Sequence, residues 1–444
     1  SSPLWRHSVQ TSNPVWPVLA MAVGCSDGAA APEGMVEVGD GGSSSSSRPP
    51  LRVVEFFAGM GGMRCAGTLS GAPVQVVAAY EISEICAEAY RHNFGGADWK
   101  LKTIERLKAE ELDRLGGDVW VMSPPCQPFT RSGRRQDHED NRTLALLHLI
   151  QVLGEMRTPP RFLLLENVIG FERSESRRRL LTMLASLGWE GAEFALDPES
   201  FGLPNRRPRY YGLFRDGAAR EASGSEQDAP SCCHWRPASE LLGPPAQEEG
   251  AADGGADAED FVPELQGTPW QAGSPPALGD FLQAPEDLAR EEAALGYSLE
   301  IPQEVMQQRL DKECRDDIHL RSDRTSSCLT KVNGRLPRGF SPLVVVDEAE
   351  AGLLEQRPKV SAQGEGPGAA TDHIWRPGVR VRYLSPAEQL RLMGYPETYS
   401  FPPKLGFKEI AGLVGNSLNV KIVSWLIRVL LAGEGAPPPE LHGP

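Results

Sequence analysis

Between residues 51 and 215, short apolar runs alternate with stretches whose apolar positions recur at helical spacing. The runs RVVEFF, VQVVAAYE, DVWVMS, RFLLLENV and RYYGLF have the length and the β-branched or aromatic content of buried strands. Segments such as ISEICAEAYRHNF and NRTLALLHLIQVLGEM lie between them with helical periodicity. This alternation predicts an α/β fold, in which helices cover both faces of a mostly parallel sheet.

The alternation stops near Asp216 and returns close to the C-terminus. Residues 216–290 are acidic and rich in Gly, Pro and Ala, which predicts a flexible insertion. The helical segments SPAEQLRLMG and NVKIVSWLIRVLLAG close the pattern. We therefore predict one α/β domain formed by residues 51–215 and 373–432, interrupted by a smaller domain over 216–372. The C-terminal helix is expected to return to the first domain.

The two ends of the chain lack this patterning. Residues 1–50 are rich in Gly, Ser, Ala and Pro and are expected to be disordered, and residues 433–444 form a short tail. The apolar stretch Val15–Val23 contains Pro17 and is short for the core of a signal peptide, so Met21 is a candidate start residue. No run of 18 or more apolar residues occurs, so we expect no membrane span.

The eight cysteines are scattered without repeated spacing. This argues against a disulfide framework and favours a reducing intracellular compartment, either cytoplasm or nucleus. The only local cluster is Cys232-Cys233-His234. Adjacent cysteines in a polar loop rarely hold a metal, so we expect no metal site.

The net charge of −15 is concentrated in one part of the chain. Residues 216–300 contain 18 acidic and 3 basic side chains, so this segment alone accounts for the net charge. The remainder is close to neutral and can carry a basic face. The acidic isoelectric point therefore does not exclude a polyanionic partner.

The first predicted strand ends in EFFAGMGG, a glycine-rich turn into a helix that contains Gly59, Gly61 and Gly62. A turn without Cβ atoms lets a ligand approach the backbone, although such a turn can also serve packing alone. Glu81 ends the second strand, 22 residues after Gly59, where a carboxylate can accept hydrogen bonds from both ribose hydroxyls. Together these features predict a cofactor of the adenosine type.

Cys126 follows the carboxyl end of the strand DVWVMS, and ligands of open α/β sheets bind at the carboxyl ends of the strands. Pro124, Pro125 and Pro128 restrict the backbone around it, which suits a nucleophile that must be held in place. A buried structural cysteine in a tight turn is the alternative. A cysteine–histidine hydrolase is disfavoured, because no histidine lies in a supporting motif.

The next strand, RFLLLENV, brings Glu166 and Asn167 to its carboxyl end. A buried acid there can interact with a heterocycle as charge develops, although a helix-capping role is also possible. In NRRPRYYG, Arg207 and Arg209 alternate and would face one side of a strand. Two guanidinium groups suit a pyrimidine carbonyl or a phosphate, whereas solvated charge at a strand edge is the simpler alternative.

These motifs, in this order, resemble those of the cytosine-5 methyltransferase family: FFAGMGG, YE, SPPCQPFT, ENV, NRRPR and GNSLN. The stretches KTIERL, LLENVIGFE and RYLSPAEQLRLMGYP are more closely similar to the branch of that family that methylates cytosine 38 of aspartate tRNA. The resemblance implies a Rossmann-like class I methyltransferase domain that uses S-adenosylmethionine, with a smaller target-recognition domain inserted.

The resemblance also implies roles for individual residues. Cys126 would add to C6 of the cytosine, Glu166 would engage N3 and the exocyclic amine, and Arg207 would contact the ring carbonyl, with Arg209 supporting the site. The implied cofactor contacts are Phe57, Gly59, Gly61, Gly62, Glu81, Ile104, Asn416 and Ser417. The implied substrate contacts are Arg131, Asn167, Cys328 and Thr330.

Three positions depart from the tRNA branch. Leu329 stands where that branch has Phe in a Cys-Phe-Thr motif, so we expect a weaker stacking contact. Ile169 replaces a usual Lys, which removes one possible RNA-facing charge. The acidic insertion 216–290 is unlike the compact recognition domain of the family.

A tRNA substrate suits a chain of this kind, because an anticodon loop offers an unpaired base. Phosphate contacts are expected from the basic stretches 131–135, 173–179 and 331–338. The protein is expected to be a monomer. DNA is a possible minor substrate. The alternatives are a DNA cytosine-5 methyltransferase and a catalytically idle RNA-binding relative.

Overall fold

The computed structural model describes residues 48–125, 143–217, 233–242, 264–268, 273–336, 341–356 and 373–439. Two predicted site residues, Cys126 and Arg131, lie outside these ranges. So do most of the predicted N-terminal tail and much of the predicted acidic insertion.

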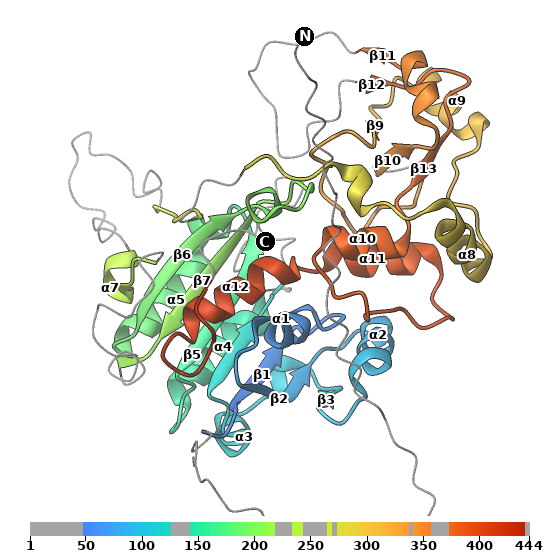
Figure 1. Cartoon of the computed structure of the whole chain (residues 1–444). Coiled ribbons are helices and arrows are strands. Elements are labelled where there is room, and N and C mark those ends of the chain that lie inside the picture. The colour runs from blue at the N-terminus through green and yellow to red at the C-terminus, as the bar shows by residue number, and fades with distance from the viewer. Residues whose placement is uncertain are drawn as a thin grey trace, which may run out of the picture. The chain divides into compact units, whose positions relative to one another are not determined.

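An eight-stranded sheet with the order β3-β2-β1-β4-β5-β7-β6-β8 forms the centre of the fold (Figure 1). Its strands are β1 (Leu51–Phe56), β2 (Val74–Tyr80), β3 (Trp99–Lys100), β4 (Val119–Met122), β5 (Phe162–Val168), β6 (Glu190–Leu196), β7 (Arg209–Arg215) and β8 (Arg236–Pro237). The first five strands in the sheet are mutually parallel, whereas β7 runs antiparallel to both β5 and β6. The predicted α/β class is confirmed.

Helices cover both faces of this sheet (Figure 1). One face carries α1 (Gly62–Ser70), α2 (Glu84–Phe94) and α12 (Val420–Leu430), and the other carries α3 (Ala109–Leu115), α4 (Leu144–Glu155) and α5 (Glu175–Ser186). Neighbouring strand residues enter opposite cores: Val53 packs on the α1 side and Val54 on the α4 side. This two-sided burial explains why the strands are continuous apolar runs rather than alternating ones.

The C-terminal segment consists of α11 (Phe407–Asn416) and α12, and α12 packs against α1. The Asn419 side chain accepts a hydrogen bond of 3.2 Å from the backbone N–H of Ile422 and so caps α12. By length and composition, Phe407–Leu430 could cross a membrane, but 83% of its most apolar window is buried inside the fold. We therefore identify it as core.

A second, smaller group of elements surrounds a three-stranded sheet with the order β13-β10-β9. It contains α8 (Pro285–Leu295), α9 (Gln303–Asp311), β9 (Asp317–His319), β10 (Pro342–Val345), β11 (Glu355–Gln356), β12 (His373–Ile374) and β13 (Val381–Tyr383). Its core includes Leu299, Met306 and Trp375, together with Phe407 of α11. The helix α10 (Pro386–Leu392) follows β13. The described chain also contains the 3-10 turns η1 (Ile104–Arg106), η4 (Phe171–Arg173), η5 (Pro198–Phe201), η7 (Leu278–Phe281) and η8 (Glu348–Leu353).

Two short strands differ from the boundaries that the sequence predicts. β8 lies within 216–290, yet it pairs with β6 in the large sheet, and α7 (Ala238–Leu241) packs on α5 behind it. β13 lies after residue 373, yet it belongs to the small sheet. Segments of two or three residues carry no periodicity of their own, so tertiary pairing alone decides where they lie.

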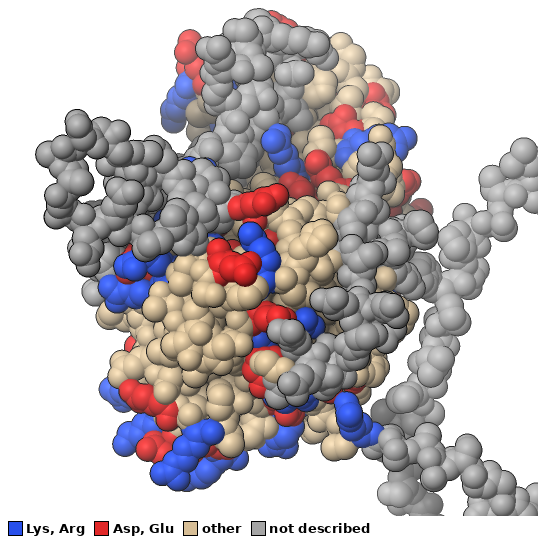
Figure 2. Space-filling model, turned by 90° about the vertical axis from the view of Figure 1, so that its left-hand side faces the viewer, with Lys and Arg blue, Asp and Glu red and all other residues tan. Residues whose placement is uncertain are grey.

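On the face shown in Figure 2, Lys and Arg side chains are interspersed with Asp and Glu. Within the basic stretch 173–179, Arg178 and Arg179 are exposed but ion-paired with Glu175. The expectation of a phosphate contact is wrong for Arg177, which is buried and makes two hydrogen bonds of 2.7 and 2.6 Å to Glu193.

Candidate active site

The predicted site residues gather along one edge of the large sheet. Because β1, β2, β3, β4 and β5 are parallel, their carboxyl ends share this edge. The antiparallel strand β7 starts there, since Arg209 pairs with Val168 at the end of β5. The glycine turn, Glu81, Glu166 and Arg209 are therefore brought together by strand direction alone.

The glycine turn after β1 contains three left-handed residues, Phe57, Gly59 and Gly61, with φ of 55°, 53° and 91°. A Cβ on Gly61 would lie 2.3 Å from the Phe94 ring, so Gly61 is needed for packing. A Cβ on Gly59 would have only the Phe57 carbonyl oxygen within reach, at 4.0 Å. Gly59 is thus the glycine whose missing side chain leaves open space for a ligand.

Glu81 is held at the end of β2 by backbone donors. Its Oε2 accepts a hydrogen bond of 3.2 Å from the N–H of Gly59, and its Oε1 accepts from the N–H groups of Ile82 and Ser83, at 2.8 and 2.9 Å. These bonds fix the carboxylate beside the glycine turn, and a carboxylate has lone pairs left for a diol. Ile104, in η1 after β3, is buried near the same edge.

Two tyrosines that the sequence analysis missed connect the glycine turn with the turn between α11 and α12. The Tyr399 hydroxyl donates to the carbonyl oxygen of Met60 at 2.7 Å. The Tyr395 hydroxyl lies 2.6 Å from Oγ of Ser417. Asn416, the other predicted contact in this turn, is exposed at the end of α11. The stretch GYPETY, which follows α10, is the sequence feature that could have identified these two tyrosines.

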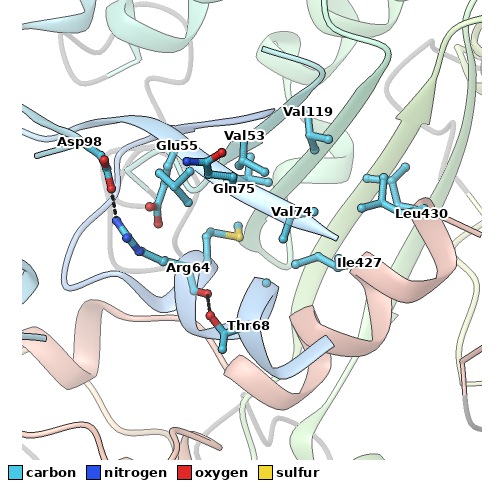
Figure 3. Close-up of a pocket in the computed structure, with 15 residues that line it drawn as sticks. Val53, Glu55, Arg64, Thr68, Val74, Gln75, Asp98, Val119, Ile427 and Leu430 are labelled. Atoms are coloured by element: carbon cyan, nitrogen blue, oxygen red, sulfur yellow. Dashed lines mark hydrogen bonds and ion pairs between the residues drawn. The ribbon is translucent and has the colours of Figure 1, made fainter. Parts of the chain in front are cut away.

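A cavity of about 260 Å³ lies behind the glycine turn, between the sheet and the helices α1 and α12 (Figure 3). Glu55 of β1 lines it, is fully buried, and accepts a 3.3 Å hydrogen bond from the Tyr90 hydroxyl. Burial raises the pKa of Glu55 to about 8. Arg64, which pairs with Asp98, lies beside it. Phe57, Gly59 and Glu81 do not line this cavity.

Glu166 sits at the end of β5 between side chains from both neighbouring strands. The Ser123 hydroxyl donates a hydrogen bond of 2.7 Å to its Oε2, and Nε of Arg209 lies 3.6 Å from its Oε1. The glutamate is 7% exposed, enough for contact with a ligand at the edge. Its neighbour Asn167 is buried, and its amide donates to the carbonyl oxygen of Pro124 at 3.4 Å, which links the residues that follow β4 and β5.

The Arg207 guanidinium hydrogen-bonds to backbone carbonyl groups of two other segments of the chain. Its Nη1 donates to the carbonyl oxygen of Leu329 at 2.6 Å, and its Nη2 donates to the carbonyl oxygens of Gly415, at 3.1 Å, and Ser417. Arg207 is 3% exposed, whereas the Arg209 side chain is 15% exposed and faces Glu166. This geometry suits a structural role for Arg207 and a ligand contact for Arg209, the reverse of the roles implied by the sequence.

Cys328 lies against both arginines, with its Sγ 3.3 Å from Nη1 of Arg207 and 3.8 Å from Nη2 of Arg209. Burial opposes ionisation of this thiol, but the two positive charges outweigh it and lower the pKa of Cys328. Thr330 donates to Oδ1 of Asn333 at 3.0 Å. The segment 328–330 packs tightly on α11, because a Cβ on Gly415 would lie 2.1 Å from the backbone of Thr330.

The structure corrects one expectation about this segment. Leu329 is 1% exposed and belongs to the main hydrophobic core, so it does not present a stacking surface to a base. Leu in place of Phe therefore changes core packing. Ile169, in contrast, is 41% exposed to solvent, three residues after Glu166.

The chain is similar to known proteins over most of its length. Residues 51–229 match the family described as C-5 cytosine-specific DNA methylase. A human protein named tRNA (cytosine(38)-C(5))-methyltransferase is 33% identical over 403 residues, which cover 86% of this chain and 99% of the relative. A Dictyostelium discoideum protein named DNA (cytosine-5)-methyltransferase is 31% identical over 386 residues, covering 86% and 94%.

A crystal structure of a mutant DNMT2 from Spodoptera frugiperda superimposes with a TM-score of 0.61 at 27% identity, covering 86% of this chain and 99% of that one. The human relative exceeds 30% identity over nearly its whole length. On this similarity, the chain belongs to the C-5 cytosine methyltransferase family.

Proposed function

We propose that this protein transfers a methyl group from S-adenosylmethionine to C5 of cytosine 38 in the anticodon loop of a tRNA, with aspartate tRNA as the substrate. The name of the human relative, which aligns over 99% of its length, supports the tRNA target. The observation that carries the chemistry is the carboxyl group of Glu166, fixed between Ser123 and Arg209 on the edge that also holds the glycine turn.

The residues at the glycine turn fit the cofactor. Gly59 leaves open space, and Glu81 presents a carboxylate oriented by three backbone N–H groups, as a ribose diol requires. When bound, S-adenosylmethionine supplies an electrophilic methyl group. Tyr399 and Tyr395 fix the backbone of Met60 and the side chain of Ser417 around this space.

The chain's own groups prepare the cytosine. The Cys126 thiolate adds to C6, which makes C5 nucleophilic, and Glu166 engages N3 and the exocyclic amine as charge develops on the ring. Arg209 contacts the ring carbonyl, because its guanidinium is beside Glu166 and Arg207 is engaged by backbone carbonyls. After C5 has gained the methyl group, a base removes the C5 proton, and the bond between C6 and sulfur breaks.

Single-stranded loops suit this site better than duplex DNA. A base in an anticodon loop is already unpaired, so removing it from its neighbours costs less than extruding it from a duplex. Lys331 and Arg335 are exposed beside the segment that contains Cys328 and are the proposed phosphate contacts. We further propose DNA as a minor substrate, a monomeric enzyme, and a location in the cytoplasm or nucleus.

Methyl transfer from tritiated S-adenosylmethionine tests the proposal. Purified protein is incubated with aspartate tRNA, with the same tRNA carrying uridine at position 38, and with duplex DNA. We expect the strongest label in the first, weaker label in duplex DNA and none in the uridine variant, and bisulfite sequencing should place the tRNA label at cytosine 38. Greater labelling of DNA than of tRNA would contradict the tRNA assignment, and labelling of the uridine variant would contradict the position.

A further inference from the structure

The register of two parallel strands places Ser123 beside Glu166. In the pairing of β4 with β5, Met122 lies opposite Leu165, so the next residue on each strand projects from the same edge. The Ser123 hydroxyl uses this proximity to donate its 2.7 Å hydrogen bond to Oε2 of Glu166. A hydrogen bond of this length to a carboxylate is a strong one.

The second oxygen of Glu166 lies in a different environment. Its Oε1 faces Arg209 across 3.6 Å, which is within ion-pair range and longer than a hydrogen bond. The strand β7 supplies Arg209 from the other side, because Arg209 pairs with Val168, two residues beyond Glu166. The two carboxylate oxygens are thus distinguished: one is anchored to β4, and the other is directed toward the arginine.

We propose that Ser123 is a positioning residue for methyl transfer, whose hydroxyl anchors Oε2 of Glu166 so that Oε1 meets the target cytosine next to Arg209. This inference rests on the proposed function and adds to it the group that orients the catalytic acid. Without the hydroxyl, the carboxyl group rotates about its last side-chain bond, and fewer molecules present Oε1 to N3 and the exocyclic amine. Orientation of this kind contributes to the rate rather than to binding.

The adjacent described residues Pro124 and Asn167 do not replace Ser123. Pro124, the next residue, has no N–H to donate. The amide of Asn167 is directed to the carbonyl oxygen of Pro124, at 3.4 Å, and its side-chain oxygen accepts from the N–H of Val168 at 2.8 Å. Among the described residues, Ser123 is therefore the side chain that hydrogen-bonds the Glu166 carboxyl group.

The test compares Ser123→Ala with Ser123→Thr, which keeps the hydroxyl, and with Ser186→Ala as a matched control. The Ser186 side chain is exposed, and among the described residues its hydroxyl bonds the carbonyl oxygen and the sulfur of Met183 in its own helix. We expect Ser123→Ala to lower kcat on tRNA about tenfold, the effect of one hydrogen bond to a charged group, with KM and cofactor affinity within about twofold of wild type. Threonine should restore most of the rate, and Ser186→Ala should behave as wild type.

A double-mutant cycle with Glu166→Ala decides whether Ser123 acts through the glutamate. In single-turnover measurements, Ser123→Ala should cost less than about twofold once Glu166 has been removed. An undiminished tenfold loss in that background, or a rate for Ser123→Ala equal to wild type, would overturn the role of Ser123. A wild-type protein inactive on tRNA would instead overturn the proposed function itself, and the inference with it.

Discussion

The carbonyl oxygen of Leu329 lies 2.6 Å from Nη1 of Arg207, and this contact joins the segment 328–330 to the residues that precede β7. The same guanidinium reaches the turn between α11 and α12 through Gly415 and Ser417. Replacement of Arg207 with Ala would leave several buried carbonyl groups without a donor. We expect a loss of about 3 kcal/mol in the free energy of unfolding, measured by urea denaturation.

Arg209→Ala should separate activity from stability. Because Arg209 faces Glu166, we expect methyl transfer to fall by at least about a hundredfold. The free energy of unfolding should stay within about 1 kcal/mol of wild type. The contrast with Arg207→Ala supplies the control. Equal destabilisation by the two substitutions would contradict the distinction between a structural and a ligand-facing arginine.

Alanine substitutions at Gly59 and Gly61 should affect different properties of the protein. Both have positive φ, so alanine costs about 1 to 2 kcal/mol at either position. At Gly61 the new Cβ also collides with the Phe94 ring, so Gly61→Ala should lower the melting temperature much more than Gly59→Ala. Gly59→Ala should instead weaken cofactor binding in calorimetric titration. Equal melting temperatures for the two variants would contradict this reading.

Glu55 should make stability fall as pH rises. Burial raises its pKa from 4.5 to about 8, so the folded protein keeps a proton that the unfolded chain releases. The contribution is fully present below the unfolded pKa of 4.5 and declines toward the folded pKa of about 8. The slope is about 1.4 kcal/mol per pH unit within this window.

Glu55→Gln removes this titration while it keeps the shape of the side chain. The difference in unfolding free energy between wild type and variant should therefore change with pH between 5 and 6. His319 stays protonated in the folded state over this range, because Asp317 outweighs the effect of burial and raises its pKa to about 9. A difference that does not vary over this window would show that Glu55 is not buried as a protonated acid.

Leu329→Phe restores the aromatic residue of the Cys-Phe-Thr motif and tests whether this position stacks on RNA. Because Leu329 is 1% exposed, the larger ring should overpack the core and cost about 1 to 3 kcal/mol of stability. Affinity for tRNA should not improve. A gain in tRNA affinity without loss of stability, measured by filter binding and thermal melting, would contradict the core assignment.

The sequence predicts the sheet and its active-site edge because both follow from local patterns. Apolar runs set the strands, and parallel direction brings Glu81 and Glu166 to one edge. The bond between Ser123 and Glu166 depends on the register of β4 and β5, which no single run encodes. The buried position of Leu329 depends on contacts with distant segments, as do the hydroxyl bonds of Tyr395 and Tyr399. These features emerge only with the tertiary structure.

Covalent trapping tests the central claim most directly. A tRNA that carries 5-fluorocytosine at position 38 has no removable C5 proton, so the adduct with Cys126 should persist after methylation. We predict a denaturant-resistant complex of protein and tRNA that requires S-adenosylmethionine and is absent for Cys126→Ala, which should also lack methyl transfer to normal tRNA. Methylation of cytosine 38 by Cys126→Ala at the wild-type rate would contradict the account.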